Sequence, residues 1–201
     1  MTPISANLQA VRARIDAAAR AAGRDPGSVS LLAVSKTWPA DCVRAAAAAG
    51  QRAFGENYVQ EGCAKTAELS GLGLEWHFIG PLQSNKTRPV AAAFDWVHSV
   101  DRLKIAERLS AQRPPEKPPL DVCLQVNVSG EATKSGCAPA EAPALAHAVA
   151  ALPNLRLRGL MCIPEPTDDV AEQRTAFRAL RALYERLRQE GLPLDTLSMG
   201  M

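Results

Sequence analysis

The sequence is poor in aromatic residues and lacks any long uninterrupted apolar segment. Phe, Trp and Tyr together make up 4% of its 201 residues, and no stretch approaches the roughly 18 consecutive apolar residues that a membrane-spanning helix needs. Charged residues interrupt residues 1–23 throughout, which excludes the apolar run of a secretory signal peptide. We therefore expect no membrane contact and no secretory leader.

Neither sign of charge dominates, and the cysteines form no pattern. The 23 basic and 21 acidic residues give a formal net charge of +2, which leaves no electrostatic footprint for nucleic acid or a membrane surface. The cysteines are odd in number and contain no C-x-x-C pair, so neither a metal framework nor a disulfide framework is indicated. We expect free thiols, no bound metal and a cytoplasmic protein. The cysteines are Cys42, Cys63, Cys123, Cys137 and Cys162.

Short apolar segments alternate with amphipathic ones along the whole chain. Strand-like segments are 29–35, 52–55, 75–80, 95–100, 121–128, 155–163 and 195–199. Helical segments are 3–22, the stretch after Pro39, 57–69, 84–92, 101–112, 139–151 and 168–190. This rhythm predicts an α/β fold with a parallel sheet and outer helices. No interdomain linker is evident, so we expect a single domain over residues 1–201.

The strand count leaves two architectures open. Seven strands behind an extra N-terminal helix fit a (β/α)₈ barrel of the TIM type with its eighth strand missing, and they also fit an open doubly wound sheet. The dinucleotide-binding pattern G-x-G-x-x-G is lacking, because Gly71 and Gly73 precede a strand and a third glycine is absent. Periodicity alone does not choose between the barrel and the open sheet.

Polar residues gather where the predicted strands end. Parallel α/β folds bind ligands at the carboxyl ends of their strands, because the loops converge there. We therefore expect a single binding mouth. The residues at these ends are Lys36, Glu56, Asn57, Gln83, Ser99, Asp101, Asn127, Ser129, Met161 and the segment Ser198-Met199-Gly200.

Lys36 has two interpretations. It closes LLAVSK directly after an apolar strand, so its amine could simply extend to water at the rim. Alternatively, desolvation beside Leu32, Val34 and Trp38 would favour the neutral amine, which can attack an aldehyde. Spacing alone does not separate the two.

Longer motifs are more specific. The strings in question are LLAVSKTWP (31–39), FGENYVQE (54–61), WHFIGPLQSNK (76–86), SVDRLKIAERL (99–109), QVNVSGEATKSG (125–136), GLMCIP (159–164) and SMGM (198–201). Together and in this order they resemble the pyridoxal phosphate homeostasis protein family, which is related to the N-terminal barrel of alanine racemase. The resemblance spans essentially the whole chain.

The resemblance implies a monomeric (β/α)₈-type barrel that carries pyridoxal 5′-phosphate (PLP) as a Schiff base on Lys36. It places Asn57 near the cofactor and Ser198, Met199 and Gly200 at the start of the phosphate loop. It implies no dedicated turnover but a part in vitamin B6 homeostasis, with PLP-dependent apo-enzymes as possible recipients of the cofactor. Compared with the family pattern, the chain stops one helix and one strand early, so part of the phosphate site is expected to be missing.

Other functions follow from the same residues. The alternative within PLP chemistry is an amino-acid racemase or a related enzyme, which needs a second base such as a tyrosine; Tyr184 is expected to be packed, which leaves Tyr58. A barrel that forms a lysine imine with a sugar phosphate, as class I aldolases do, is a further hypothesis. Lys86 and Lys134 are candidates for phosphate contacts, although a solvated surface position is expected for each.

Overall fold

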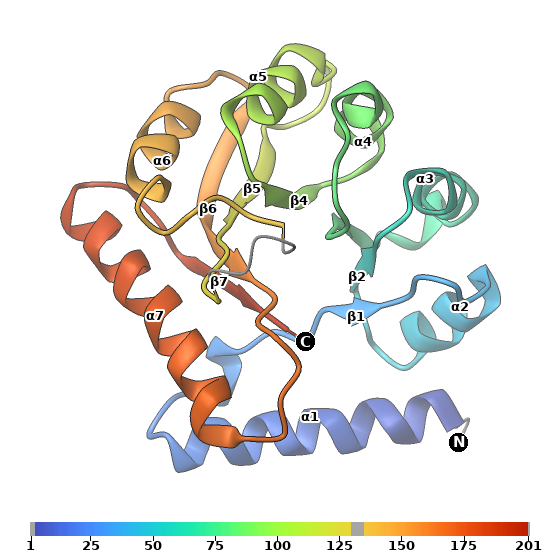
Figure 1. Cartoon of the computed structure of the whole chain (residues 1–201). Helices are drawn as coiled ribbons and strands as arrows, with labels where there is room; N and C mark the ends of the chain where they lie inside the picture. The colour runs from blue at the N-terminus through green and yellow to red at the C-terminus, as the bar shows by residue number, and fades with distance from the viewer. Residues whose placement is uncertain (1–2, 130–134, 201) are drawn as a thin grey trace. The chain divides into compact units, whose positions relative to one another are not determined.

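The computed structural model describes residues 3–129 and 135–200 (Figure 1). It divides into two compact units, residues 1–77 and residues 78–201, which are treated in turn. Every predicted strand and helix overlaps an observed one, so the predicted β/α alternation behind an N-terminal helix is confirmed. The prediction of one domain over residues 1–201 stays a prediction. No helix in the described ranges is both long enough and apolar enough to cross a membrane.

The first unit begins with the longest of its helices. Its helices are α1 (Pro3–Ala21), α2 (Ala40–Ala48) and α3 (Val59–Glu68), with short 3-10 turns at Pro26–Ser28 and Ser70–Leu72. Its strands are β1 (Ala33–Val34), β2 (Ala53–Glu56) and β3 (Glu75–Phe78), and the unit boundary falls at the end of β3. Proline at the first position of α1 is favourable, because its missing N–H would have no partner inside the helix.

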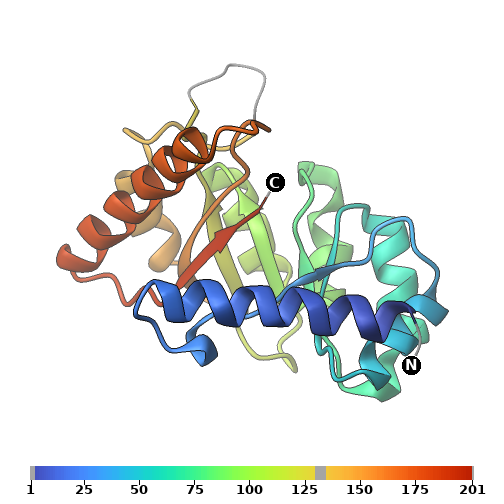
Figure 2. The same cartoon turned by 90° about the horizontal axis from the view of Figure 1, so that it is seen from below.

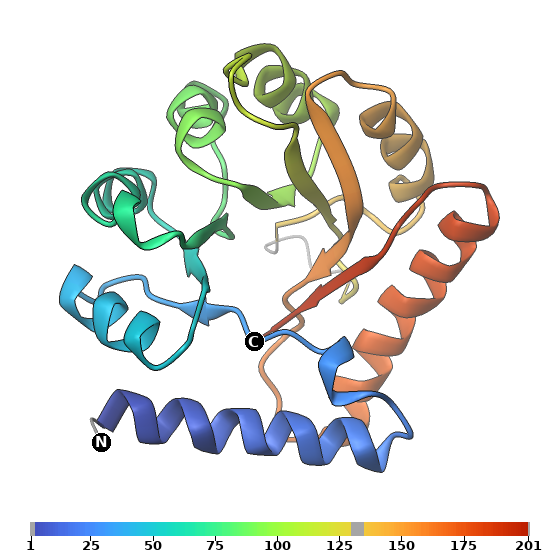
Figure 3. The ribbon, with the colours of Figure 1, turned by 180° about the vertical axis from the view of Figure 1, so that it is seen from behind.

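Helix α1 packs beside α2, as Figures 2 and 3 show. The Arg12 guanidinium on α1 donates to the Ala49 carbonyl at 3.2 Å and to the Gln51 side chain at 3.0 Å. The amide of Gln51 in turn donates to the carbonyls of Leu31 at 2.7 Å and Ala53 at 2.8 Å. Gln51 is buried, so these bonds satisfy its amide and join α1, the approach to β1, and β2.

Strand β1 is shorter and more exposed than predicted. The apolar run 29–35 was expected to form a strand buried on both faces, but only Ala33 and Val34 pair with β2, opposite Phe54 and Gly55. The Val34 side chain is 47% exposed. The physical reason is the position of β1 at one end of the strand order, where a strand has a neighbour on one side only.

The second unit is built of four parallel strands with helices outside them, as Figures 1 and 3 show. The strands are β4 (Trp96–Val100), β5 (Leu120–Gln125), β6 (Leu155–Cys162) and β7 (Thr196–Met199), hydrogen-bonded in that order. The helices are α4 (Thr87–Ala93), α5 (Leu103–Gln112), α6 (Ala142–Ala150) and α7 (Val170–Gln189), with a 3-10 turn at Ser84–Lys86 before α4.

The core of the second unit lies between these strands and helices. β5 and β6 are buried along most of their length, as is typical of parallel strands covered on both faces. Leu180 and Leu187 on α7 are fully buried, and they form the apolar face of this amphipathic helix. The free thiols of Cys123 and Cys162 are buried as small core groups. Burial raises the pKa of the Cys162 thiol to about 11, so it stays protonated at neutral pH.

Arg158 joins the amino-terminal ends of the strands in this unit. Its guanidinium donates to both carboxylate oxygens of Asp195, at 2.7 to 3.0 Å, and to Asp121 at 2.9 Å. It also lies 4.7 Å from the centre of a Trp96 ring, within the range of a cation–π contact. β4, β5, β6 and the start of β7 are thus connected at the end of the strands opposite the expected mouth, where barrel folds carry residues that serve stability.

Gly159 on β6 sits where the backbone of β7 comes too close for any side chain. A Cβ atom at this position would lie 1.7 Å from the Thr196 carbonyl oxygen. β6 and β7 pair here, Gly159 opposite Thr196, so neither backbone can give way without loss of the ladder.

We predict that Gly159→Ala lowers the free energy of unfolding by about 2–3 kcal/mol, because overpacking forces β6 and β7 apart. Denaturant unfolding of the purified protein measures it. Gly71→Ala is the matched control: its Cβ would meet nothing within 4 Å, and a change below about 0.5 kcal/mol is expected. Equal effects of the two substitutions would contradict this account of β6 and β7.

Candidate functional site

Lys36 stands at the corner of a tight turn that follows β1. The Trp38 amide donates to the Ser35 carbonyl at 3.1 Å and closes a four-residue turn with Lys36 and Thr37 in its centre. Thr37 has φ +67°, the positive value that type II turns require at their third position. Ser35 is tied to β2 by its own amide, which donates to the Gly55 carbonyl at 2.9 Å. The structure therefore presents the Lys36 side chain from a defined backbone corner.

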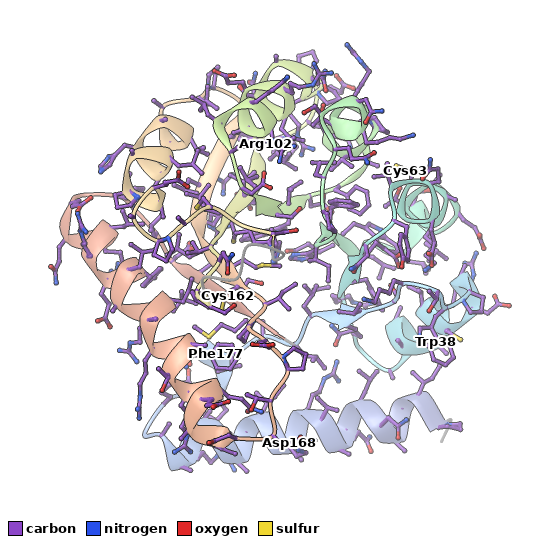
Figure 4. The ribbon with its side chains drawn as sticks, viewed as in Figure 1. Trp38, Cys63, Arg102, Cys162, Asp168 and Phe177 are labelled. Carbon is purple, nitrogen blue, oxygen red and sulfur yellow. The ribbon has the colours of Figure 1, made fainter. Side chains whose placement is uncertain are left out.

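The environment of Lys36 differs from the one we expected. Dehydration by Leu32, Val34 and Trp38 is wrong for this structure, because Lys36 is exposed and Trp38, labelled in Figure 4, is 60% exposed. Val34, on a strand at one end of the strand order, is itself 47% exposed. The amine of Lys36 is consequently accessible to a dissolved aldehyde.

Behind the turn lies a buried ionic network centred on Lys65 of α3, the helix that also carries Cys63 in Figure 4. The Lys65 ammonium donates to the Ser35 carbonyl at 2.7 Å, to Glu56 at 2.8 Å and to Glu61 at 2.7 Å. The Ser35 hydroxyl donates to the same Glu56 oxygen at 2.6 Å. This network was missed by sequence reasoning, although the spacing of Glu61 and Lys65 by four residues in a helix is a visible signal.

Two neighbouring acceptors at the end of β2 lack a partner among the described residues. They are Oε2 of Glu56 and Oδ1 of Asn57. Glu56 is fully buried and Asn57 half-buried. Buried acceptors are normally satisfied, so such atoms indicate a place for a water molecule or for a donor group of a ligand. Asn57, predicted as a cofactor residue, directly follows Glu56, which belongs to the network behind the Lys36 turn.

The predicted phosphate residues lie in the second unit. Ser198 and Met199 end β7, and Gly200 follows it. The Ser198 hydroxyl and Nδ1 of His98 share a hydrogen bond of 2.7 Å. A Cβ at Gly200 would meet nothing within 4 Å, which leaves its backbone open to a ligand. Because Lys36 and Asn57 belong to the first unit, the structure describes the two halves of the predicted site separately.

The remaining candidates have ordinary structural roles or lie outside the description. The Tyr184 hydroxyl donates to the Leu194 carbonyl at 3.0 Å, so Tyr184 is packed as expected. Lys86 closes the 3-10 turn before α4 and is half-buried. Lys134 lies outside the described residues. Met161 is buried in β6, in agreement with a packing role.

The described residues contain no cluster of metal-binding side chains. No group of three or more His, Cys, Asp and Glu side chains within those ranges could hold a metal ion. His77 pairs with Glu75 at 2.9 Å and His147 with Glu190 at 3.2 Å.

A cavity of about 290 Å³ opens in the second unit. Its walls come from the loops after β5 and β6 and from the start of α7, and the predicted cofactor residues do not line it. The lining residues are Ser129, Pro164, Glu165, Pro166, Thr167, Glu172, Gln173 and Ala176.

Comparison with known proteins gives a consistent result. Residues 6–201 match the family model described as "Alanine racemase, N-terminal domain". A protein of Pseudomonas aeruginosa named pyridoxal phosphate homeostasis protein is 67% identical over 201 residues, which cover all of this chain and 86% of that protein.

Solved structures agree with these matches. The structure of PipY from Synechococcus elongatus with PLP bound is 38% identical, with a TM-score of 0.81 over 98% of this chain and 88% of that one. Alanine racemase from Corynebacterium glutamicum shares the fold alone, at 18% identity and a TM-score of 0.64 over 96% of this chain and 53% of that one. The predicted α/β class of the racemase-type barrel is thereby confirmed. The chain belongs to the pyridoxal phosphate homeostasis protein family.

Proposed function

We propose that this chain binds PLP as a Schiff base on Lys36 and acts in intracellular vitamin B6 homeostasis, without a dedicated turnover of its own. In this proposal it is a cytoplasmic monomer that holds the cofactor and releases it to PLP-dependent apo-enzymes. The observation that carries the proposal is the position of Lys36: an exposed amine on a turn whose flanking residues are held by hydrogen bonds to Lys65 and Glu61. The names of the relatives and the PLP-bound neighbour support the identity of the aldehyde.

The chemistry requires one amine and one aldehyde. Lys36 would hold PLP through its amine nitrogen, and this condensation with the aldehyde would release the aldehyde oxygen as water together with both amine protons. The amine must be unprotonated when it attacks. The reverse reaction consumes water and frees the cofactor, so access of water to Lys36 suits a protein that must also release PLP.

The neighbouring residues fit the rest of the cofactor. Oδ1 of Asn57 and Oε2 of Glu56 are buried acceptors without described partners, so they suit a donor group of the cofactor. For the phosphate we propose the Ser198 hydroxyl and the backbone N–H groups of Met199 and Gly200, since hydroxyl and backbone donors suit a phosphate dianion. Lysine and phosphate residues belong to different units, so this part of the proposal rests on the sequence resemblance.

We predict that Lys36→Ala abolishes the visible absorbance of protein-bound PLP and the PLP label that borohydride traps on the chain. Because the side chain is exposed, stability should change by less than about 0.5 kcal/mol. Absorbance spectra and peptide mapping of the reduced protein measure the result. Lys104→Ala, an exposed substitution on α5, is the control and should keep the label. A label that persists at Lys86 or Lys134 would redirect the assignment.

We predict that Ser198→Ala weakens PLP binding about five- to tenfold, the loss of roughly 1 kcal/mol for one hydrogen bond. Titration with pyridoxal, which lacks the phosphate, should show no such difference. Ser70→Ala in an exposed 3-10 turn serves as the control. If Ser198→Ala weakens both aldehydes equally, Ser198 does not act on the phosphate.

An amino-acid racemase is the second candidate, favoured by the match to the racemase N-terminal domain. It needs a second base besides Lys36, and of the two tyrosines Tyr184 is engaged with Leu194 while Tyr58 is 56% exposed. We predict that the PLP-loaded protein racemises L-alanine no faster than free PLP, as chiral chromatography would measure. A faster rate that disappears in Lys36→Ala would establish the enzyme instead.

A further inference from the structure

Lys65 has no part in the chemistry proposed above, yet it is one of the most confined charged groups in the first unit. It is 6% exposed, and its side chain comes from the last turn of α3. A buried ammonium is costly unless its donors are all satisfied. Lys65 has three donors and three oxygen acceptors within 2.8 Å, so its hydrogen-bonding capacity is used completely.

The acceptors of Lys65 determine where both chain neighbours of Lys36 lie. On one side, Ser35 accepts from Lys65 through its carbonyl and donates through its hydroxyl to Glu56. On the other side, the Thr37 amide donates to the Glu61 oxygen that Lys65 also contacts, at 2.6 Å. Residues before and after Lys36 are therefore anchored to one ammonium, directly or through one carboxylate.

The backbone at Thr37 makes such anchoring necessary. A β-branched residue with φ +67° is a rare and strained conformation, and strained residues persist only where surrounding contacts over-determine them. The turn hydrogen bond from the Trp38 amide to the Ser35 carbonyl is one such contact. The bond from the Thr37 amide to Glu61 is another, and Lys65 donates to the same Glu61 oxygen.

The charges of the network reinforce one another. Burial lowers the pKa of Lys65, but its hydrogen bonds to Glu56 and Glu61 and their negative charges outweigh burial, and the pKa is raised. The hydrogen bond from Lys65 is the main cause that lowers the pKa of Glu61. Both groups thus keep their charges at neutral pH, and the hydrogen bonds between them are of the strong, charge-assisted kind.

We propose that Lys65 is a positioning residue for Lys36: through Ser35, Glu56 and Glu61 it fixes the Ser35–Trp38 turn, so that the Lys36 amine meets the aldehyde from one direction. This inference rests on the proposed function of Lys36. Small displacements of a reacting group, on the order of 1 Å, reduce rates by up to roughly 100-fold. Lys65 acts only through the backbone of the turn and forms no bond to the cofactor.

The first test replaces Lys65 by methionine in the full chain, which keeps the length of the side chain but removes its donors. Lys65→Met should slow the growth of the PLP absorbance band at Lys36, and its borohydride-trapped yield at fixed time, on the order of 10- to 100-fold. Lys104→Met, an exposed lysine on α5, is the matched control and should react like the wild type. A Lys65→Met protein that folds and reacts at the wild-type rate would overturn the proposal.

A second pair of variants keeps the inference testable if Lys65→Met does not fold. Glu61 is less buried, with 28% of its side chain exposed, so Glu61→Ala should fold while it loses the acceptor for the Thr37 amide. We expect a roughly tenfold slower reaction at Lys36. Glu61→Gln retains an acceptor oxygen and should restore most of the rate. Equal rates of PLP attachment in Glu61→Ala and the wild type would refute the proposed positioning of Lys36.

Amide hydrogen exchange tests the positioning role of Lys65 separately from the proposed function, because the measurement needs no cofactor. The Thr37 amide should exchange faster in Lys65→Met and Glu61→Ala than in the wild type and in Lys104→Met. Unchanged exchange overturns the positioning role whatever PLP does. If the wild type is never labelled at Lys36, the proposed function fails, and the exchange rates alone decide whether Lys65 holds the turn.

Discussion

The interaction on which the first unit depends is the buried pair of Lys65 and Glu56. Removal of both charges from water is costly, and the cost is offset only where the remaining hydrogen-bonding capacity is satisfied. Here the ammonium finds Ser35 and Glu61 as further acceptors, and one Glu56 oxygen also accepts the Ser35 hydroxyl. The ends of β1 and β2 and helix α3 are therefore held by one cluster. Apolar side chains in place of Lys65 and Glu56 could pack, but they could not form the hydrogen bonds that hold the Ser35–Trp38 turn.

In the second unit an ionic network lies at the amino-terminal ends of the strands. Arg158 connects Asp121 and Asp195 and covers Trp96 near the amino ends. Its pKa is raised, chiefly by the hydrogen bonds from its guanidinium to Asp195. At the carboxyl ends the same unit keeps smaller polar groups, such as the pair of His98 and Ser198. This division agrees with the general rule that one end of a parallel α/β fold serves stability and the other serves ligands.

Much of the fold could be predicted from sequence, because alternating apolar periodicity reports the elements directly. The extent of β1 could not, since exposure of Val34 depends on which neighbours its strand has. Asn57 and Ser198 were predicted as cofactor residues from motifs and stay predictions, whereas Lys65 was not noticed. A lysine in a helix looks like a solvated side chain, and only the tertiary arrangement of Ser35 and Glu56 makes it a buried one. The pairing of Arg158 was hidden for the same reason, because its partners lie 37 residues away on either side.

The proposed function needs an exposed Lys36 for release of PLP and a fixed turn for its binding. An enzyme that stabilises reactive intermediates excludes water from its site, whereas a carrier must let water in to hydrolyse the lysine–cofactor bond. The exposed Lys36 side chain permits that release. A mobile lysine, however, would lose entropy each time it bound the aldehyde, and preorganisation reduces that cost. A fixed turn that carries an exposed amine would therefore allow both binding and release of PLP, as the proposed function requires.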